Sequence, residues 1–156
     1  MKLYHSSDVS VPVPDIAHSR DFLDFGKGFY LTSIHEQAVK YAQRFLRRRR
    51  DAWLNAYEFE FNPSEWEVMI FDSYNKDWLD FIAKCRSGND NTDFDLIIVG
   101  IANDKVIQTL DRYFDGIISE EETLGLLKYE KPNIQYCIRS QKMLNECLKH
   151  IESKQL

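Results

Sequence analysis

The sequence predicts a single mixed α+β domain, and three observations carry that prediction. The chain has 156 residues, which is the usual length of one domain. Its residues are 44% hydrophobic and 13% aromatic, which is enough for a substantial core and too apolar for disorder. Strand and helix patterns occur along the whole length, without a repeat, a low-complexity stretch or a linker. We therefore expect residues 1–156 to form one domain.

Short strands are expected in the first half of the chain, where apolar residues alternate between turn signals. A proline-rich segment around Pro12 and Pro14 must be extended, because each proline fixes its own backbone and disfavours helix in the residue before it. A tight loop at Asp24–Gly28 precedes one of the strands. The expected strands are Lys2–His5, Phe29–Thr32, Tyr57–Phe61 and Val68–Phe71.

A helix is expected to begin at Ser33, because Ser33 and Glu36 have the spacing of a capping box. Apolar residues follow at helical intervals, so one stripe of this helix is predicted to face the core. The residues of that stripe are Ile34, Ala38, Tyr41, Ala42, Phe45 and Leu46.

The second half of the chain alternates helices with two further strands. Leu96–Val99 is continuously apolar, which indicates a strand covered on both faces. Ser119 and Glu122 form another capping box, and Ser87–Thr92 is a polar loop. The expected helices are Asp77–Arg86, Asp104–Phe114, Glu120–Leu127 and a closing amphipathic helix Gln141–Lys154, with a last strand at Ile134–Ile138.

Composition excludes several functional classes. Twenty basic residues against 25 acidic ones give a net charge of −5, which argues against a general polyanion binder. Cys85, Cys137 and Cys147 are odd in number and lack paired short spacing, so no disulfide framework or zinc ribbon is expected. Neither a signal peptide nor a membrane span is recognisable. We expect a cytoplasmic protein that does not bind membranes, and no metal site, because the four histidines lack ligand spacing.

Common catalytic signatures are incomplete in this sequence. Gly26-x-Gly28 lacks the third glycine and the preceding strand of a dinucleotide fingerprint. Asp24-Phe25-Gly26 has the letters of a kinase metal motif, but the chain is too short for a kinase. Cys137 and His5 could form a nucleophilic pair in space, although a small apolar residue inside a strand is the more ordinary reading of Cys137.

One constellation rises above this background. It consists of Leu3-Tyr4-His5-Ser6-Ser7, the segment Gly26-Lys27-Gly28-Phe29-Tyr30-Leu31-Thr32, Tyr41 on the next helix, and a strand centred on Gln135. This pattern resembles the ADP-ribosyltransferase superfamily, in the branch with a His-Tyr-Glu triad that includes diphtheria toxin and the poly(ADP-ribose) polymerases. Tyr30 and Tyr41 are eleven residues apart, as the two tyrosines are in that branch.

Nearly the whole chain, from Leu3 to about Leu148, also resembles a small bacterial family of poorly characterised proteins assigned to that superfamily. The segments that carry this likeness are Asp24–Thr32, Trp78–Phe81 and Gly100–Asp104.

The resemblance implies a split, mostly antiparallel β-sheet core with peripheral helices, and NAD as the substrate. The expected reaction transfers ADP-ribose to a protein or nucleic acid and releases nicotinamide, through an oxocarbenium-like state. His5, Tyr41 and Gln135 occupy the catalytic positions, with a ring donor of His5 on a ribose hydroxyl and Tyr41 stacked on nicotinamide. The expected NAD-binding residues are His5, Ser6, Arg20, Gly28, Phe29, Tyr30, Thr32 and Tyr41.

Three of these assignments have competing interpretations. Tyr30 is more often a structural strand residue beside the pocket than a catalytic one. Arg20 could pair with the pyrophosphate or be an ordinary surface arginine. Asn103 and Asp104 follow a buried strand and are candidates for the acceptor side, whereas their ordinary role would be a helix N-cap.

Two departures from the family pattern affect the expected activity. Ser6 stands where the branch has glycine, so a backbone contact to the carboxamide must tolerate a Cβ. Gln135 stands where the branch has the catalytic Glu, and a neutral amide cannot act as a general base. Catalysis could proceed by positioning alone, use another acid, or be absent, which would leave an NAD-binding or ADP-ribose-binding module. The other candidate acids are Asp24, Asp104 and Glu120–Glu122.

Five arginines, Arg44 and Arg47–Arg50, lie together near a predicted helix end. They complement the helix dipole there, or they form a local phosphate-binding or docking patch. That patch supports another interpretation of the chain as a nucleic-acid-binding protein, and an interaction protein without a cleft is a separate alternative. Small bacterial members of the resembled superfamily are often toxins of toxin–antitoxin or phage-defence modules, so an antitoxin partner is also expected by analogy.

Overall fold

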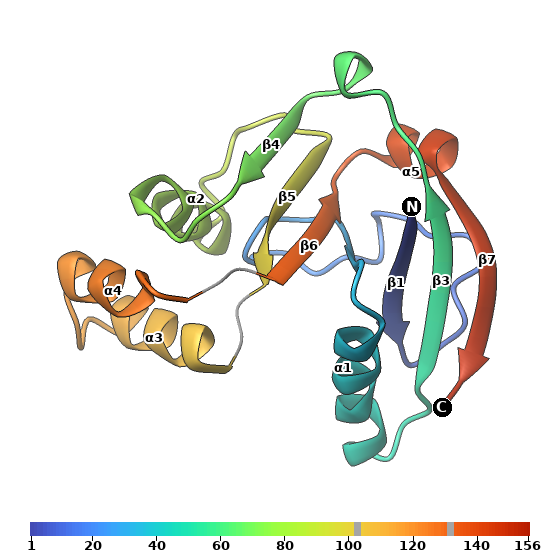
Figure 1. Ribbon diagram of the computed structural model, residues 1–156, viewed down its shortest axis with the longest axis horizontal. Helices are drawn as coiled ribbons and strands as arrows, with labels where there is room; N and C mark the ends of the chain where they lie inside the picture. Colours follow the sequence, from blue (N-terminus) through green and yellow to red (C-terminus); the bar gives the residue numbers. More distant parts are fainter. Residues whose placement is uncertain (102–103, 131–132) are drawn as a thin grey trace.

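The computed structural model describes residues 1–101, 104–130 and 133–156. Within these residues, seven strands form one sheet in the order β4-β5-β6-β2-β1-β3-β7, with helices packed around it (Figure 1). Only β4 and β5 pair in parallel among the described strands, so the predicted α+β class with a mostly antiparallel sheet is confirmed. The strands are β1 (Lys2–Ser7), β2 (Phe29–Thr32), β3 (Trp53–Phe59), β4 (Val68–Phe71), β5 (Leu96–Ile101), β6 (Asn133–Ile138) and β7 (Leu148–Gln155). The helices are α1 (His35–Arg47), α2 (Lys76–Ser87), α3 (Asp104–Phe114), α4 (Glu120–Leu127), α5 (Gln141–Cys147) and a short 3-10 helix (Pro63–Glu65).

The sheet consists of two halves that meet at one point. β1 pairs with β3 along its whole length, and β2 pairs with β6 along its whole length. Between the halves, β1 and β2 share only the pair Tyr4 and Thr32. One half-sheet is therefore β4-β5-β6-β2 and the other is β1-β3-β7, and we call the Tyr4–Thr32 contact the junction.

The register across the junction assigns each side chain to a face. Tyr4 pairs with Thr32, Thr32 with Gln135, and Gln135 with Val99, so these side chains share one face of the sheet. The next row, which includes Leu31, Tyr136 and Ile98, points to the opposite face.

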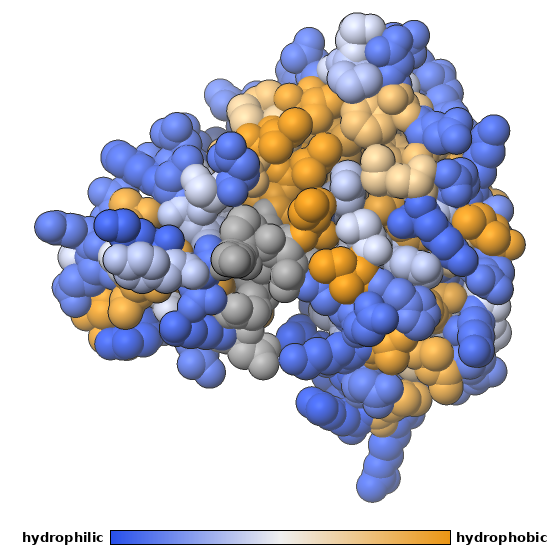
Figure 2. All heavy atoms as spheres, viewed as in Figure 1, coloured by the Kyte–Doolittle hydropathy of each residue, from blue (hydrophilic) through white to orange (hydrophobic). Residues whose placement is uncertain are grey.

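Each face carries its own hydrophobic cluster. The cluster on the Leu31 face extends over both half-sheets, from Leu3 on β1 to Leu96 on β5, and includes residues of α5. The cluster on the Val99 face packs the β4-β5-β6-β2 half against α2, α3 and α4, with Trp78 as its largest fully buried residue. Hydrophobic side chains also reach the surface over β4, β5 and β6, in the middle of the face seen in Figure 2.

The first helix begins later than the sequence predicts. α1 starts at His35 with Ile34 as its N-cap, and no side chain caps it. Instead, Thr32 Oγ1 accepts the backbone N–H of Ile34. The side chain that bonds the backbone before the helix is therefore that of Thr32, and not of Ser33 as predicted. Of the predicted inward stripe, Ala38 and Ala42 are buried, whereas 47% of Tyr41 is exposed.

The prediction of a closing helix over Gln141–Lys154 is wrong in its second half. Helix α5 ends at Cys147, and Leu148–Gln155 then form β7 on the outer edge of β3. The helical spacing of apolar residues in this segment is overridden by edge pairing, which satisfies the backbone of β3. The register shifts by one residue between Ala56 and Tyr57, because β7 has an extra residue there, Ile151.

The other predicted elements are close to their observed positions. Strands β2 and β4 and helices α3 and α4 have the predicted bounds, and the Ser119–Glu122 capping box of α4 is present. Strand β3 begins and ends earlier than expected. The three cysteines are free and buried, and no helix in the described part of the chain has the length and hydropathy to cross a membrane.

Candidate functional site

The junction holds His5, the first residue of β1 beyond the single pair between the half-sheets. His5 Nδ1 lies 2.8 Å from the backbone oxygen of Tyr30 on β2. Its ring stacks on Phe29 with a centroid distance of 4.2 Å and an interplanar angle of 29°. The imidazole thus connects β1 to β2 where no further backbone pair joins them, and Phe29 fixes the plane of the ring.

The proton of His5 can be located from its partner. A carbonyl oxygen only accepts hydrogen bonds, so Nδ1 carries the proton and donates to Tyr30. Burial lowers the pKa of His5 below its ordinary value of 6.5, which keeps the ring neutral near pH 7. Nε2 is then a lone-pair acceptor that makes no hydrogen bond within the described residues. The sequence predicted a ring donor toward a ribose hydroxyl, whereas this geometry offers an acceptor for that hydroxyl.

Ser6 connects the junction to α1. Its Oγ donates to the backbone oxygen of Ala38 at 2.6 Å, and its side chain is buried. The carbonyl of Ala38, near the start of α1, accepts this bond, so the hydroxyl proton of Ser6 is engaged in positioning the helix. Any contact of Ser6 with a ligand would have to use its backbone or its remaining lone pairs.

Gln135 and Thr32 lie side by side on the α1 face of the sheet. Thr32 Oγ1 donates to Gln37 Oε1 at 3.0 Å, which links β2 to the first turn of α1. Gln135 is half-buried, and its neighbours in the register row, Val99 and Thr32, carry no carboxylate. His5 leaves β1 on the opposite face, because it follows Tyr4 by one residue. The predicted catalytic residues His5 and Gln135 therefore do not project from one face of the sheet.

Tyr41 lies on the exposed side of α1 rather than on its buried stripe. The guanidinium of Arg44 lies 4.9 Å from the centroid of the Tyr41 ring, and Phe45 meets the ring edge-on at 6.0 Å. One aromatic face of Tyr41 is thus in contact with a cation. The structure does not assign Tyr41 to a core role, which was its ordinary interpretation.

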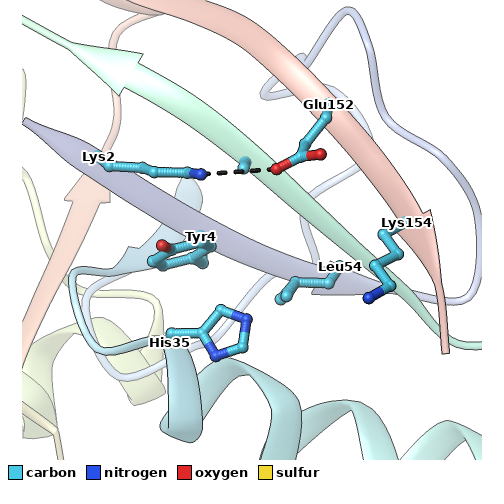
Figure 3. A pocket seen from close by; sticks show the side chains of 7 residues that line it. Lys2, Tyr4, His35, Leu54, Glu152 and Lys154 are labelled. Atoms are coloured by element: carbon cyan, nitrogen blue, oxygen red, sulfur yellow. Dashed lines mark ion pairs between the residues drawn. The ribbon is translucent and has the colours of Figure 1, made fainter.

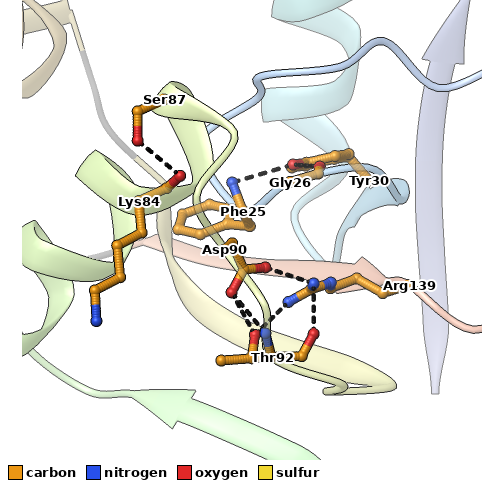
Figure 4. Close-up of polar contacts among 8 residues, drawn as sticks. All are labelled: Phe25, Gly26, Tyr30, Lys84, Ser87, Asp90, Thr92 and Arg139. Carbon is orange, nitrogen blue, oxygen red and sulfur yellow. Dashed lines mark hydrogen bonds and ion pairs between the residues drawn. The ribbon is translucent and has the colours of Figure 1, made fainter.

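The glycine loop before β2 is built for packing. Tyr30 donates its hydroxyl to Gly26 O at 2.6 Å and accepts Phe25 N–H at 3.2 Å (Figure 4). A Cβ on Gly28 would lie 2.6 Å from Cys137 Sγ and 3.0 Å from Ile138 O. Close approach to β6 therefore requires glycine at position 28, independently of any ligand. Burial raises the pKa of Tyr30, which matches a structural role for this residue.

Cys137 is not a nucleophile partner for His5. It lies on the same face as Gln135, since the two are separated by one residue on β6. Its side chain is buried, and burial raises the pKa of its thiol to about 12. A thiol that stays protonated under Gly28 serves packing.

The remaining predicted residues are placed as follows. Arg20 is exposed and makes no ion pair within the described part of the chain. Asn103 lies outside the described residues, and Asp104 is the first residue of α3. The described residues include no cluster of three or more potential metal ligands.

A polar cluster beside the glycine loop was not anticipated. Arg139 Nη2 lies 2.6 Å from Asp90 Oδ2, and Arg139 Nη1 donates to Thr92 Oγ1 at 3.1 Å (Figure 4). Both partners of the ion pair are largely buried. The pKa of Asp90 is lowered, because hydrogen bonds from Thr92 and the charge of Arg139 together outweigh desolvation. The only sequence signal was a charged residue directly after a buried strand.

Within the described residues two surface hollows stand out, and the second borders the junction because Tyr4 lines it. One, of about 360 Å³, is lined by Thr92–Asp95, Arg139 and Ser140. The other, of about 200 Å³, lies where β1, β3 and β7 pass the start of α1 (Figure 3). In the second hollow, Lys2 pairs with Glu152 at 3.5 Å and Tyr4 meets His35 edge-on at 5.1 Å.

Residues 1–150 match the model of a family described as a protein of unknown function, DUF3990, and the chain belongs to that family. No curated protein and no solved structure matches the chain significantly.

Proposed function

We propose that the chain is an NAD-dependent mono-ADP-ribosyltransferase that binds NAD at the junction. The observation that carries the proposal is the placement of His5: a neutral, oriented imidazole inserted where the two half-sheets separate. The resemblance of Tyr4-His5-Ser6 and Gly26-x-Gly28-x-Tyr30 to the His-Tyr-Glu branch of ADP-ribosyltransferases supports the same substrate.

The chemistry requires few groups from the protein. The bond between ribose C1′ and the nicotinamide nitrogen breaks, and nicotinamide leaves with the bonding pair. An acceptor nucleophile then forms a bond to C1′ and loses its proton. Nε2 of His5 would accept a ribose hydroxyl, and an aromatic side chain would stack on the leaving ring. These groups hold and orient NAD, and holding the reacting atoms in place is itself a large part of such catalysis.

Gln135 supports a second candidate function, which is NAD binding without turnover. An amide can hydrogen-bond a ribose hydroxyl, but it cannot take the proton of the acceptor. The residues paired beside it in the sheet, Val99 and Thr32, offer no carboxylate in its place. Transfer would then depend on an acceptor that is already a good nucleophile.

Calorimetry with NAD and an assay of nicotinamide release test the proposal directly. His5→Ala should weaken NAD binding at least tenfold, because the ribose loses its acceptor and Phe29 loses its stacked partner. The matched control is His18→Ala, since His18 is exposed and its ring bonds Asp15 at the surface. Absence of NAD binding by the wild-type protein would overturn both candidate functions, and binding without release would leave only the second.

Gln135→Glu separates positioning from acid–base chemistry. If Gln135 faces the ribose, a carboxylate there should create or raise NAD hydrolysis, measured as released nicotinamide. The control is Gln108→Glu, which makes the same chemical change on α3, outside the junction. An unchanged rate in Gln135→Glu together with unchanged NAD affinity would remove this residue from the site.

A cellular role follows from the same proposal. We propose that the transferase acts in the cytoplasm of the cell that makes it, and that a neutralising protein controls it as in toxin–antitoxin pairs. Expression of the wild type beside His5→Ala provides the test: growth arrest by the wild type alone is expected, and equal growth of both strains would contradict it.

A further inference from the structure

The end of α1 carries a concentration of positive charge that the junction does not use. Arg44 and Arg47 lie in the last turn of α1, and Arg48 is its C-cap. Arg49 and Arg50 follow before β3 begins. We call these five residues the arginine turn. The end of α1 lies at the foot of the molecule in Figure 1, and hydrophilic side chains project from it in Figure 2.

Most of this charge is not neutralised by the protein. Arg50 pairs with Asp8 at 3.4 Å, whereas Arg47, Arg48 and Arg49 make no ion pair within the described residues. Removing five positive charges from a net charge of −5 leaves −10 on the rest of the chain. The arginine turn is thus a local cationic surface on an acidic protein, which focuses binding of a polyanion on one place.

Complementing the helix dipole explains only part of the cluster. That effect is confined to the last turn of a helix, which accounts for Arg44 and Arg47. Arg49 has a backbone φ of 56°, in the left-handed region that glycine adopts without steric cost. An arginine at this position is less favourable than a glycine for the observed turn. The backbone conformation therefore does not explain why residue 49 is an arginine.

A flat aromatic ring lies beside the positive charge. Tyr41 is 47% exposed one turn before Arg44, whose guanidinium lies 4.9 Å from the Tyr41 ring centroid. Single-stranded nucleic acids bind to surfaces that combine cations for the phosphates with exposed rings for the bases. An anionic membrane would attract the same charge, but it has no bases to stack on the exposed ring.

We infer that the arginine turn binds single-stranded nucleic acid. Where the proposed function holds, this surface also names the acceptor class, because α1 leads from the arginine turn directly to Ser6 and the junction. A nucleic-acid strand bound at Arg47–Arg49 would thereby lie at one end of α1, and the other end of this helix borders the proposed NAD site. The binding itself does not depend on the transferase activity.

The test measures binding of fluorescein-labelled 12-nucleotide DNA and RNA by anisotropy, as a function of NaCl concentration. The variant Arg47→Ala/Arg48→Ala/Arg49→Gly keeps the Arg50–Asp8 and Arg44–Tyr41 contacts. We expect it to bind at least tenfold more weakly and to reduce the salt slope by about 2, at about 0.7 per lost phosphate contact. Lys84→Ala/Lys149→Ala/Lys154→Ala removes the same charge from exposed sites on α2 and β7 and should bind as the wild type does.

Arg49→Gly alone gives an independent readout. It should weaken oligonucleotide binding while leaving the thermal midpoint equal or higher, because glycine relieves the left-handed backbone. A purely structural role for Arg49 would produce the opposite pair of results.

Other outcomes overturn the inference. It fails if neither oligonucleotide binds, if both triple variants lose binding equally, or if the protein binds phosphatidylserine vesicles and no oligonucleotide. Calorimetry with NAD on the Arg47→Ala/Arg48→Ala/Arg49→Gly variant measures NAD binding independently of oligonucleotide binding. The two proposals can therefore fail separately. Oligonucleotide binding by a wild type that does not bind NAD would retain the nucleic-acid surface and refute the transferase.

Discussion

The two half-sheets are stabilised in different ways. The β4-β5-β6-β2 half has helices α2, α3 and α4 on one face and the shared cluster on the other, so it is covered on both sides. In the described part of the chain, the β1-β3-β7 half has α1 opposite the shared cluster, and the buried residues of α1 are Ala38 and Ala42. Its outer strand β7 is largely exposed and rich in charged residues, as edge strands often are.

This difference shows that the two half-sheets are held together at the junction mainly by packing on one face of the sheet. The cluster on the Leu31 face crosses from one half to the other, whereas the Val99-face cluster stays within the first half. At the junction itself, one strand pair and the His5 side chain connect the halves. A candidate binding site thus coincides with the part of the sheet that has the fewest strand pairs. Movement of the strands to fit a ligand would break the fewest backbone hydrogen bonds there.

The largest effect is expected when the shared cluster is weakened. Leu31→Ala removes a side chain that is 2% exposed at the centre of that cluster and should cost about 3 kcal/mol of unfolding free energy, measured by urea denaturation. Leu126→Ala, in an exposed position of α4, should change it little. If Leu31→Ala produces two separate transitions, the halves fold independently once the cluster is weakened, and a cost no larger than that of Leu126→Ala would contradict the shared core.

A smaller effect is expected from filling the space at Gly28. In Gly28→Ala, the new Cβ would overlap Cys137 Sγ and press on Ile138 O, so β2 must move away from β6. We expect a loss of about 1–3 kcal/mol in unfolding free energy. Gly125→Ala is the matched control, because nothing lies near its Cβ in helix α4, and it should stabilise by about 0.5–1 kcal/mol.

Adding Cys137→Ala to Gly28→Ala sharpens this result. The pair of changes should cost less than the two single variants together, since the alanine at 137 removes the overlapping sulfur. Additive costs would mean that the backbone of Ile138, rather than the thiol, limits the approach of β2 to β6.

The smallest effect concerns the pH dependence of stability. The folded protein holds His5 with a pKa below its unfolded value of 6.5, so the unfolded chain takes up a proton first as the pH falls. The contribution of neutral His5 is complete above pH 6.5 and is lost below it, at no more than about 1.4 kcal/mol per pH unit. His5→Gln should therefore have a flatter profile than the wild type between pH 6.5 and 5, measured by urea denaturation. Parallel profiles would place His5 in a solvated environment.

Local sequence patterns predicted the fold class and the elements of the better-covered half. Helices α3 and α4 could be placed because their periodicity and the Ser119 cap agree with their burial. In the other half, β7 could not be placed, because its apolar spacing is helical and its strand conformation depends on the distant edge of β3. Long-range pairing of this kind leaves no local signal.

The sequence suggested candidate residues for a site but not their arrangement. The sequence indicated His5, Thr32 and Gln135 as a group. It could not indicate that alternation along the strands puts His5 and Gln135 on opposite faces, because register between β1, β2 and β6 is set by tertiary pairing. Likewise, Gly28 is explained by a contact with β6 that lies more than a hundred residues away in the chain.

The three buried thiols provide reporters that need no engineering. Cys85 belongs to the cluster of the Val99 face and Cys147 to the cluster that spans both halves, and burial raises the pKa of each thiol. Alkylation by iodoacetamide at neutral pH can occur only when the surrounding core opens. Mass spectrometry of the alkylated peptides would therefore time the opening of each core separately, and comparing the rates with and without NAD would show which core a ligand at the junction holds closed.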